Sequence, residues 1–306
     1  MADARKHTSF VRSSLAVPGS NPHMMEKSLS AGADEVFFDL EDAVAPNMKV
    51  QARTMVADAL RRWAPFNHVQ AVRINAVGSG LAYRDVIEVV EAAGNNLDRL
   101  IVPKVDNASD IVFLDGLLSE IELALGLEMP VELEVLIESA AGAVNIGEIV
   151  NSSARVTVLI FGAGDYTADI GIERPTVFGD DVDSTHWARS GVVNHAVASG
   201  ALPIDGPYPG LRDEEGFRAA SVAARRLGFR GKWCVHPAQV PWCNQAFGVD
   251  EQEVSDAQRI LDEYEKATTE GVGAIAIDGR LVDEATRKHA ERIVAAARLQ
   301  ETEVNK

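Results

Sequence analysis

Short apolar runs rich in β-branched residues alternate along the chain with longer segments whose apolar positions recur at helical spacing. This alternation is typical of parallel βα units, in which buried strands are joined by helices that cover the sheet. Eight runs predict strands, over residues 10–17, 35–40, 69–75, 99–104, 132–137, 156–161, 201–204 and 231–235. Helices are predicted between them over residues 21–31, 47–63, 83–93, 109–126, 144–152, 189–199 and 213–227. Eight strands with intervening helices predict an α/β fold, a (β/α)8 TIM barrel.

A doubly wound open sheet is the structural alternative, because the seventh run is short and flanked by proline. Polar residues favour the barrel, since they follow many strands instead of gathering at one switch point. They are residues 12–14, 39–42, 73–75, 103–104, Glu138 and Asp165. We expect all of them on one rim, formed by the C-terminal ends of the strands.

The last part of the chain predicts a helical extension to the barrel. A helix is expected over residues 247–267, then an apolar glycine-rich stretch over 271–278, then a final amphipathic helix. A single barrel takes about 250 residues, and the chain has 306, of which 46% are hydrophobic. We therefore predict a catalytic barrel over residues 1–245 and a C-terminal extension over 246–306.

Charge and composition exclude several classes of function. The formal net charge of −17 argues against nucleic acid or an anionic membrane surface as a partner. The two cysteines, Cys234 and Cys243, lack CxxC spacing, so neither a disulfide framework nor a zinc ribbon is indicated. The first residues lack the apolar segment of a secretion signal, and no run approaches the roughly 20 apolar residues of a membrane span. We expect a cytoplasmic protein.

Glu138 and Asp165 are the candidate metal ligands, because each follows the end of a predicted strand. Two carboxylates, completed by water and substrate oxygens, are the arrangement that Mg²⁺ prefers. Gly162 and Gly164 precede Asp165 and would let the backbone approach a small ligand. The alternative interpretation is that Glu138 caps the following helix and Asp165 caps a turn.

Arg73 is a charged residue inside an apolar strand run, so its guanidinium must be paired. Its planar fork suits a substrate carboxylate or a developing enolate oxygen. The alternative is an internal ion pair with Glu41 or Asp42. For these two acids, in the segment Asp39–Asp42, we favour an orienting role in catalysis over metal binding, because excess charge would repel an anionic substrate.

Other motifs for catalysis are weak. No phosphate loop of the Walker type and no GxSxG motif occur, which argues against nucleotide hydrolysis and serine hydrolysis. His236 follows the eighth predicted strand and could face the rim, whereas His186, His195 and His289 lie on predicted helices and are expected at the surface.

Seven sequence blocks occur in a fixed order along the chain. They are residues 12–19 (RSSLAVPG), 38–42 (FDLED), 72–75 (VRIN), 103–104 (PK), 136–139 (LIES), 161–166 (FGAGDY) and 232–237 (KWCVHP). Together they resemble the citrate lyase β-subunit and malyl-CoA lyase branch of the HpcH/HpaI aldolase superfamily, and the resemblance covers nearly the whole chain.

The resemblance implies a barrel that binds Mg²⁺, or Mn²⁺, and breaks or forms a carbon–carbon bond next to a CoA thioester. It implies Glu138 and Asp165 as metal ligands and Arg73 as the contact of the keto-acid carboxylate and the thioester oxygen. It also implies an acid/base aspartate from the C-terminal segment, often supplied by a neighbouring subunit. We assign this role to Asp283, with Asp278 as the competing choice. The alternative is that Asp283 only caps the last helix.

The implied reaction is cleavage of a 3-hydroxyacyl-CoA such as malyl-CoA or β-methylmalyl-CoA to acetyl-CoA or propionyl-CoA plus glyoxylate. The open alternatives are a lyase for citryl-CoA or citramalyl-CoA, a malyl-CoA thioesterase, and a subunit of a larger complex that uses an acyl-carrier protein. The partners would be a CoA thioester and a 2-keto acid. Placement alone suggests Arg12, Lys104 and Arg280 for the CoA phosphates. The resemblance also implies a homotrimer or a dimer of trimers.

Overall fold

The computed structural model describes residues 10–63, 66, 68–172 and 184–304, with side chains described as far as residue 300. The chain divides into two compact units, Met1–Ala246 and Phe247–Lys306. Of the helices within these described ranges, none is long and apolar enough to cross a membrane.

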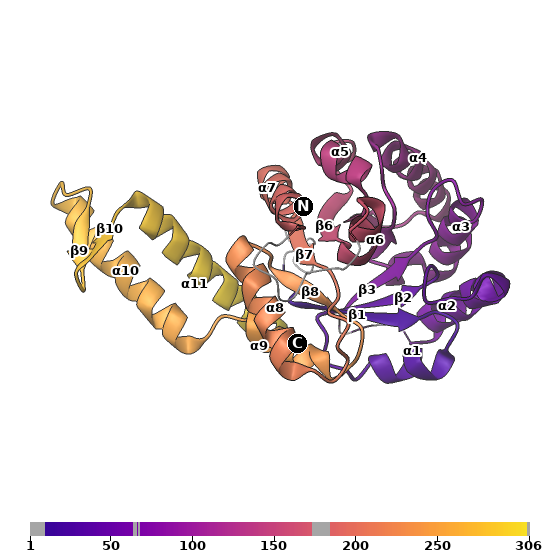
Figure 1. The fold of residues 1–306 in the computed structure, drawn as a ribbon, viewed down its shortest axis with the longest axis horizontal. Coiled ribbons are helices and arrows are strands. Elements are labelled where there is room, and N and C mark those ends of the chain that lie inside the picture. Colours follow the sequence, from indigo (N-terminus) through magenta and orange to yellow (C-terminus); the bar gives the residue numbers. More distant parts are fainter. Residues whose placement is uncertain (1–9, 64–65, 67, 173–183, 305–306) are drawn as a thin grey trace. The chain divides into compact units, whose positions relative to one another are not determined.

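In the described part of the first unit, eight parallel strands form a closed barrel in chain order, and β8 pairs with β1 (Figure 1). The strands are β1 (Ser13–Pro18), β2 (Glu35–Asp39), β3 (Val69–Arg73), β4 (Arg99–Val102), β5 (Glu132–Ile137), β6 (Val156–Phe161), β7 (Leu202–Asp205) and β8 (Gly231–Cys234). Each run predicted from the sequence overlaps one of them. The closed pairing confirms the TIM barrel and excludes the open sheet.

Helices connect the strands and lie outside them (Figure 1). They are α1 (Pro22–Ser28), η1 (Pro46–Met48), α2 (Lys49–Trp63), α3 (Ala82–Ala93), η2 (Gly94–Asn96), α4 (Ala108–Leu125), α5 (Ala140–Val150), α6 (Ala163–Asp169), α7 (His186–Ser199), α8 (Glu214–Leu227) and α9 (Gln239–Phe247). Of these, α6, α9 and the single turn η2 were not predicted. The short α6 matters for function, because it begins directly after β6 and carries Asp165 in its first turn.

Side chains inside the barrel follow the two-residue repeat of the strands. Phe37, Ala71, Ile101, Leu136 and Trp233 come from five strands and belong to one buried cluster. Successive side chains of a strand point to opposite sides, so residues two positions before or after these also face the interior. The apolar cluster therefore separates a polar layer at the N-terminal ends of the strands from another at their C-terminal ends.

The N-terminal layer is a closed group of charges around Arg99. Its Nη1 lies 2.9 Å from Oε2 of Glu35 and 2.9 Å from Oε1 of Glu134, and all three side chains are buried. Burial, followed by the charge of Glu35, raises the pKa of Glu134 well above its usual range. Arg99 thus contacts both acids while burial favours the neutral form of Glu134, and the layer serves the stability of the barrel.

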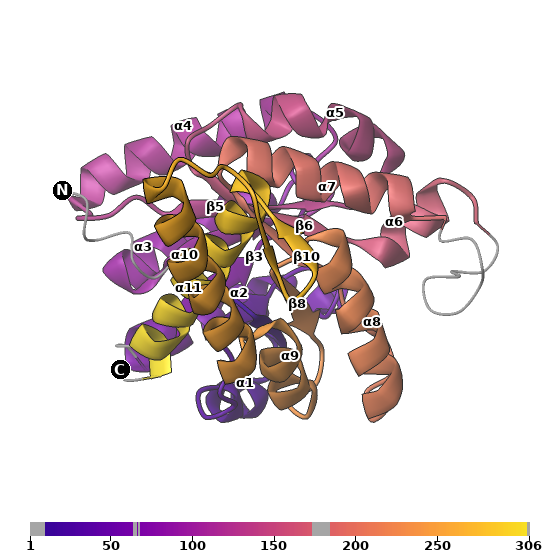
Figure 2. The same ribbon diagram turned by 90° about the vertical axis from the view of Figure 1, so that its left-hand side faces the viewer.

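The second unit consists of two long helices and a hairpin. Helix α10 (Glu251–Thr269) and helix α11 (Glu284–Val304) lie side by side, and the antiparallel strands β9 (Ile275–Ile277) and β10 (Arg280–Val282) join them at one end (Figures 1 and 2). Tyr264, Ile277 and Val282 form its buried core.

The structure refines the sequence prediction for this unit in two places. The helix predicted over 247–267 is α10 and begins later, because Phe247 ends α9 and Asp250 caps the start of α10 in a capping box with Glu253. The glycine-rich stretch contributes β9 and turns at Asp278 and Gly279. Both turn residues have positive φ, 51° and 75°, a combination that suits a two-residue hairpin turn.

Candidate active site

Arg73 and Asp39 form a largely buried ion pair at the C-terminal rim. The two residues end neighbouring strands and stand opposite each other in the register of β2 and β3. Nε and Nη2 of Arg73 donate to the two carboxylate oxygens of Asp39, at 2.8 and 2.6 Å. The backbone N–H groups of Glu41 and Ala43 also donate to Asp39, at 2.7 and 3.0 Å. Four donors therefore hold Asp39, which in turn fixes the plane of the guanidinium.

Trp233 forms the floor beneath this pair. The guanidinium carbon of Arg73 lies 5.5 Å from the centre of its ring, within the range of a cation–π contact. The ring also packs against Phe37, with centroids 4.6 Å apart. Arg73 is thus supported from below as well as from the side. Asp39 accepts hydrogen bonds from two of the five N–H groups of the guanidinium. Terminal N–H groups that Asp39 does not engage can therefore meet a ligand.

Glu138 follows β5 and is 6% exposed. Its Oε1 accepts a hydrogen bond from the backbone N–H of Lys104 at 2.8 Å. It does not cap α5, because Ser139 fills that position and accepts from the N–H of Gly142. The capping alternative for Glu138 is therefore wrong, and the carboxylate is available for other chemistry.

Gly162 makes room for Glu138. A Cβ at position 162 would lie 2.5 Å from Cβ of Glu138 and 2.7 Å from its Oε2, closer than real Cβ contacts. At Gly164 the same test meets nothing within 4 Å. A side chain at position 162 would therefore collide with Glu138, which explains the glycine there. Position 164 instead borders an open region next to Asp165.

Asp165 lies beside Glu138, in the first turn of α6, with a side chain 48% exposed. Burial, and then the negative charge of Asp165, raise the pKa of Glu138 to about 8. Two carboxylates this close repel each other unless a proton or a cation lies between them.

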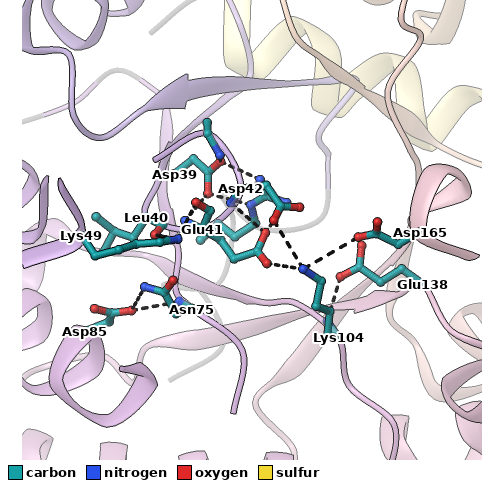
Figure 3. Close-up of polar contacts among 12 residues, drawn as sticks. Asp39, Leu40, Glu41, Asp42, Lys49, Asn75, Asp85, Lys104, Glu138 and Asp165 are labelled. Carbon is teal, nitrogen blue, oxygen red and sulfur yellow. Dashed lines mark hydrogen bonds and ion pairs between the residues drawn. The ribbon is translucent and has the colours of Figure 1, made fainter. Parts of the chain in front are cut away.

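Lys104 supplies positive charge to this group (Figure 3). Its Nζ lies 2.5 Å from Oε1 of Glu41, 3.4 Å from Oδ1 of Asp42 and 4.0 Å from Oδ2 of Asp165. The side chain is 42% exposed. Burial is the largest single influence on the pKa of this ammonium and lowers it. The three acids, with Glu41 contributing most, more than offset burial, so the pKa is raised overall.

Glu41 and Asp42 both lie at the rim, next to Lys104. Glu41 contacts Arg73 as well as Lys104, because its Oε2 is 3.3 Å from Nη1 of Arg73. Burial raises the pKa of Glu41, although Lys104 and Arg73 oppose that effect. Burial also acts to raise the pKa of Asp42, but its contact with Glu41 and the charge of Lys104 lower it overall. The alternative for Arg73, an internal ion pair, is thus correct for Glu41, while Asp39 is the stronger partner.

The rim residues fit a divalent cation. Glu138 and Asp165 supply hard oxygen ligands of the kind that divalent cations prefer. The ammonium of Lys104 approaches Asp165, which shows that this carboxylate can be reached by a positive charge. The described residues contain no group of three or more His, Cys, Asp or Glu side chains arranged for a metal ion. Two protein carboxylates would leave most of an octahedral shell to water and substrate, as Mg²⁺ prefers.

Arg12 does not lie near these residues. It precedes β1, and its guanidinium binds Asp34, which precedes β2, at 2.8 and 2.7 Å. Both positions are at the N-terminal ends of the strands, opposite the rim. The predicted place of residues 12–14 on the rim is therefore wrong, and Arg12 is no longer a candidate for CoA phosphates. His236 follows β8 directly, at the rim.

The two candidate aspartates of the second unit have local partners. Asp278 lies in the hairpin turn and binds Nη2 of Arg259 at 2.6 Å. Asp283 precedes α11, and its Oδ1 accepts from the backbone N–H and the hydroxyl of Thr286, at 3.0 and 3.1 Å. These hydrogen bonds lower the pKa of Asp283. The capping role considered as an alternative is present in the structure, and it uses Oδ1 in both contacts.

The sequence analysis missed two contributors to the site, Asp39 as the holder of Arg73 and Trp233 as its floor. A signal existed for Asp39, because it lies two residues after Phe37 and so shares its side of the strand. For Trp233 the apolar run predicted burial, but no sequence signal places its ring under a guanidinium.

Comparison with known proteins finds one matching family and several similar proteins. The model of the HpcH/HpaI aldolase/citrate lyase family matches residues 12–237. The chain is 38% identical over 301 residues to the L-malyl-CoA/beta-methylmalyl-CoA lyase of Cereibacter sphaeroides, covering 94% of this chain and 95% of that lyase. It is 32% identical over 287 residues to the citrate lyase subunit beta of Leuconostoc mesenteroides subsp. cremoris, covering 94% and 93%. A crystal structure of protein CitE from Mycobacterium tuberculosis in complex with magnesium, acetoacetate and coenzyme A has a TM-score of 0.77 and 27% identity, covering 95% of this chain and 99% of that one. The range matched by the family contains the whole rim site.

Proposed function

Because the chain belongs to the HpcH/HpaI aldolase/citrate lyase family, we propose that it is a magnesium-dependent carbon–carbon lyase that acts on malyl-CoA or β-methylmalyl-CoA. The products would be glyoxylate and acetyl-CoA or propionyl-CoA, and the reverse condensation would use the same site. One observation carries the proposal: Glu138 and Asp165 lie together on a rim that also holds a supported, cationic Arg73. The 38% identity to a lyase with these substrates supports the choice of acyl group.

Glu138 and Asp165 are the proposed holders of Mg²⁺. When bound, the ion supplies Lewis-acid polarisation of an oxygen of the 2-oxygenated carboxylate. Magnesium and coenzyme A in the crystal structure of the related CitE protein support this choice.

Arg73 would stabilise the negative charge that cleavage creates. The hydroxyl proton of the substrate passes to water, the carbonyl of glyoxylate forms, and the electrons of the broken carbon–carbon bond pass to the thioester as an enolate, which then takes a proton at its α-carbon from the acid/base residue. A guanidinium held rigidly by Asp39 needs no reorganisation at that moment, which is the condition for strong electrostatic stabilisation. Such a preorganised donor contributes on the order of 3–4 kcal/mol in measured cases.

Asp283 is the proposed acid/base residue that exchanges the proton at the α-carbon of the acyl-CoA. This assignment rests on the resemblance of the segment 278–283 to the family pattern. Asp278 is the weaker candidate, because its carboxylate is committed to Arg259. The matched experiment compares Asp283→Ala with Asp278→Ala: loss of the proton exchange in the first variant alone supports the assignment, and full activity in Asp283→Ala would refute it.

A lyase for citryl-CoA or citramalyl-CoA is the second candidate, and the 32% identity to a citrate lyase subunit beta favours it. It would use the same residues, since only the keto-acid product changes. The discrimination would come from the shape of the pocket around the acyl group.

The test incubates the purified chain with Mg²⁺ and a panel of malyl-, β-methylmalyl-, citramalyl- and citryl-CoA, following keto acid and free thiol separately. Keto acid without thiol from the malyl esters supports the proposal. Thiol release would indicate a thioesterase, and inactivity on all four free CoA esters would indicate a subunit that needs an acyl-carrier protein. Activity unaffected by Glu138→Ala or by a chelator would refute the metal assignment.

A cytoplasmic location and a homotrimer, or a dimer of trimers, complete the proposal. The oligomer would be required if Asp283 acts on a neighbouring subunit. Sedimentation of the purified chain measures this directly, and a monomer that retains full activity would contradict it. The net charge of −17 supports the absence of a nucleic-acid partner.

A further inference from the structure

Lys104 is the least explained residue of the rim. It was considered for the phosphates of CoA, yet its ammonium turns into the acidic group, with Glu41 and Asp42 on one side and Asp165 on the other (Figure 3). Arg73 cannot serve these acids equally, because its N–H groups are directed first to Asp39. Among the described residues, the ion pair recorded for Asp165 is the one with Lys104, at 4.0 Å.

The backbone of Lys104 is also unusual. Its φ is +54°, a left-handed conformation that few residues other than glycine adopt. In this conformation the backbone N–H donates to Glu138 at 2.8 Å. One residue thus contacts both proposed metal ligands, Glu138 through its main chain and Asp165 through its side chain. Strain of this kind is retained where the surrounding structure requires it.

We propose that the ammonium of Lys104 stands in for the divalent cation when the site is metal-free, and withdraws from Asp165 to Glu41 and Asp42 when the ion binds. This inference rests on the magnesium site of the proposed function and deepens it. Lys104 is then a positioning residue that sets the affinity of the site, and it keeps the carboxylates together before the ion arrives.

Three features of the side chain make the exchange feasible. Nζ is already 1.5 Å closer to Glu41 than to Asp165, at 2.5 against 4.0 Å, so withdrawal keeps its stronger partner. The side chain is 42% exposed, which leaves room for movement. Its four-carbon stem is flexible, and its three donors rotate freely.

The competition has a measurable consequence. A single and a double positive charge about 4 Å apart repel each other even in water-like surroundings, enough for roughly a thirtyfold change in affinity. Removing the ammonium while keeping the length of the side chain should therefore tighten Mg²⁺ binding by up to about thirtyfold.

The experiment measures Mg²⁺ binding to the metal-stripped full chain by calorimetry, without substrate, for the wild type and Lys104→Met. Lys104→Arg retains the charge and should bind Mg²⁺ as the wild type does. Lys104→Gly removes the ammonium and suits the positive φ, so it should match the Met variant even if Met is poorly tolerated there. Lys27→Met, on the exposed side of α1, removes the same charge elsewhere in the first unit and should change nothing.

Thermal unfolding gives a second readout. In a chelator, Lys104→Met should unfold at a lower temperature than the wild type, because the acids lose their counter-charge, and saturating Mg²⁺ should remove most of the difference. Unchanged or weaker Mg²⁺ binding in both Lys104→Met and Lys104→Gly would overturn the inference. A wild type that binds no Mg²⁺ would overturn it together with the metal assignment, whereas normal binding without lyase activity would count against the proposed reaction alone.

Discussion

Replacing Gly162 by alanine is the sharpest test of the carboxylate geometry. The added methyl would lie 2.5 Å from Cβ of Glu138, against the 3.5–4.0 Å of a comfortable carbon–carbon contact. That atom is attached directly to the backbone, so rotation of the Glu138 side chain cannot relieve the clash with it. The backbone of Gly162 adds no strain, because its φ of −93° is accessible to alanine.

The expected cost follows from overpacking a buried contact, which takes about 1–3 kcal/mol. If this strain is relieved by displacing the Glu138 carboxylate, it appears as weaker metal binding. Since about 1.4 kcal/mol is a factor of ten, Mg²⁺ affinity should fall roughly 10- to 100-fold. Calorimetric titration of the metal-stripped chain, without substrate, measures this change apart from any effect on turnover.

Gly164→Ala is the matched control, two residues further along the chain. A Cβ there meets nothing within 4 Å, so Mg²⁺ affinity should stay within about twofold of the wild type. Equal losses in both variants, or unchanged binding in Gly162→Ala, would refute the assignment of Glu138 as a ligand. An increase of KM alone in Gly164→Ala would place the substrate next to α6.

Three further changes test the electrostatics. Asp39→Ala leaves a buried guanidinium without its main partner and should lower the free energy of unfolding by about 3–5 kcal/mol. The control Asp58→Ala removes an exposed ion pair and should lower it by under about 1 kcal/mol, as measured in denaturant titrations. Similar losses in the two variants would contradict the role of Asp39. Because the pKa of Glu138 is about 8 without metal, against 4.5 ordinarily, Mg²⁺ affinity should rise between pH 6 and 8 and level above that. Between these pKa values Glu138 keeps a proton in the folded chain that it releases in the unfolded chain, so in a chelator stability should fall as pH rises from 4.5 to 8. Glu138→Gln should abolish the pH dependence of Mg²⁺ affinity and this fall in stability. Mg²⁺ binding independent of pH in the wild type would disprove this account. Glu134→Gln should change the free energy of unfolding by about 1 kcal/mol or less, because burial already favours the neutral form of Glu134. Arg99→Met should lower it by about 3–5 kcal/mol. A larger loss in Glu134→Gln than in Arg99→Met, measured by thermal unfolding, would show that Glu134 is charged.

Much of the rim could be predicted because parallel strands end on the same side of a sheet. Residues that follow different strands, such as Arg73, Glu138 and Asp165, must then converge, whatever their separation in the sequence. The structure brings these three together with Glu41 and Lys104. Arg12 failed the same reasoning, because it lies before its strand and so belongs to the opposite end.

The pairing of charges could not be predicted in the same way. The alternative interpretation of Arg73 named Glu41 or Asp42 as its partner, and Glu41 does lie 3.3 Å from its Nη1. The stronger partner is Asp39, because the register of β2 and β3 sets the two residues opposite each other. Register depends on how neighbouring strands shift along each other, and apolar alternation constrains only which side a residue faces. The backbone conformation of Lys104 is likewise set by the turn after β4.

The amino-acid sequence by itself determined the alternation of strands and helices, the parallel α/β class and the identity of the rim acids, because these follow from local periodicity and from the order of residues along each strand. Closure of the barrel was decided by the pairing of β8 with β1. Only the tertiary structure decided that Lys104 lies among the rim acids and that the ring of Trp233 packs under Arg73. It also decided that Glu138 occupies the space that a side chain at position 162 would need. Each of these is a contact between strands or helices far apart in the chain, and its distance depends on the packing of the whole barrel.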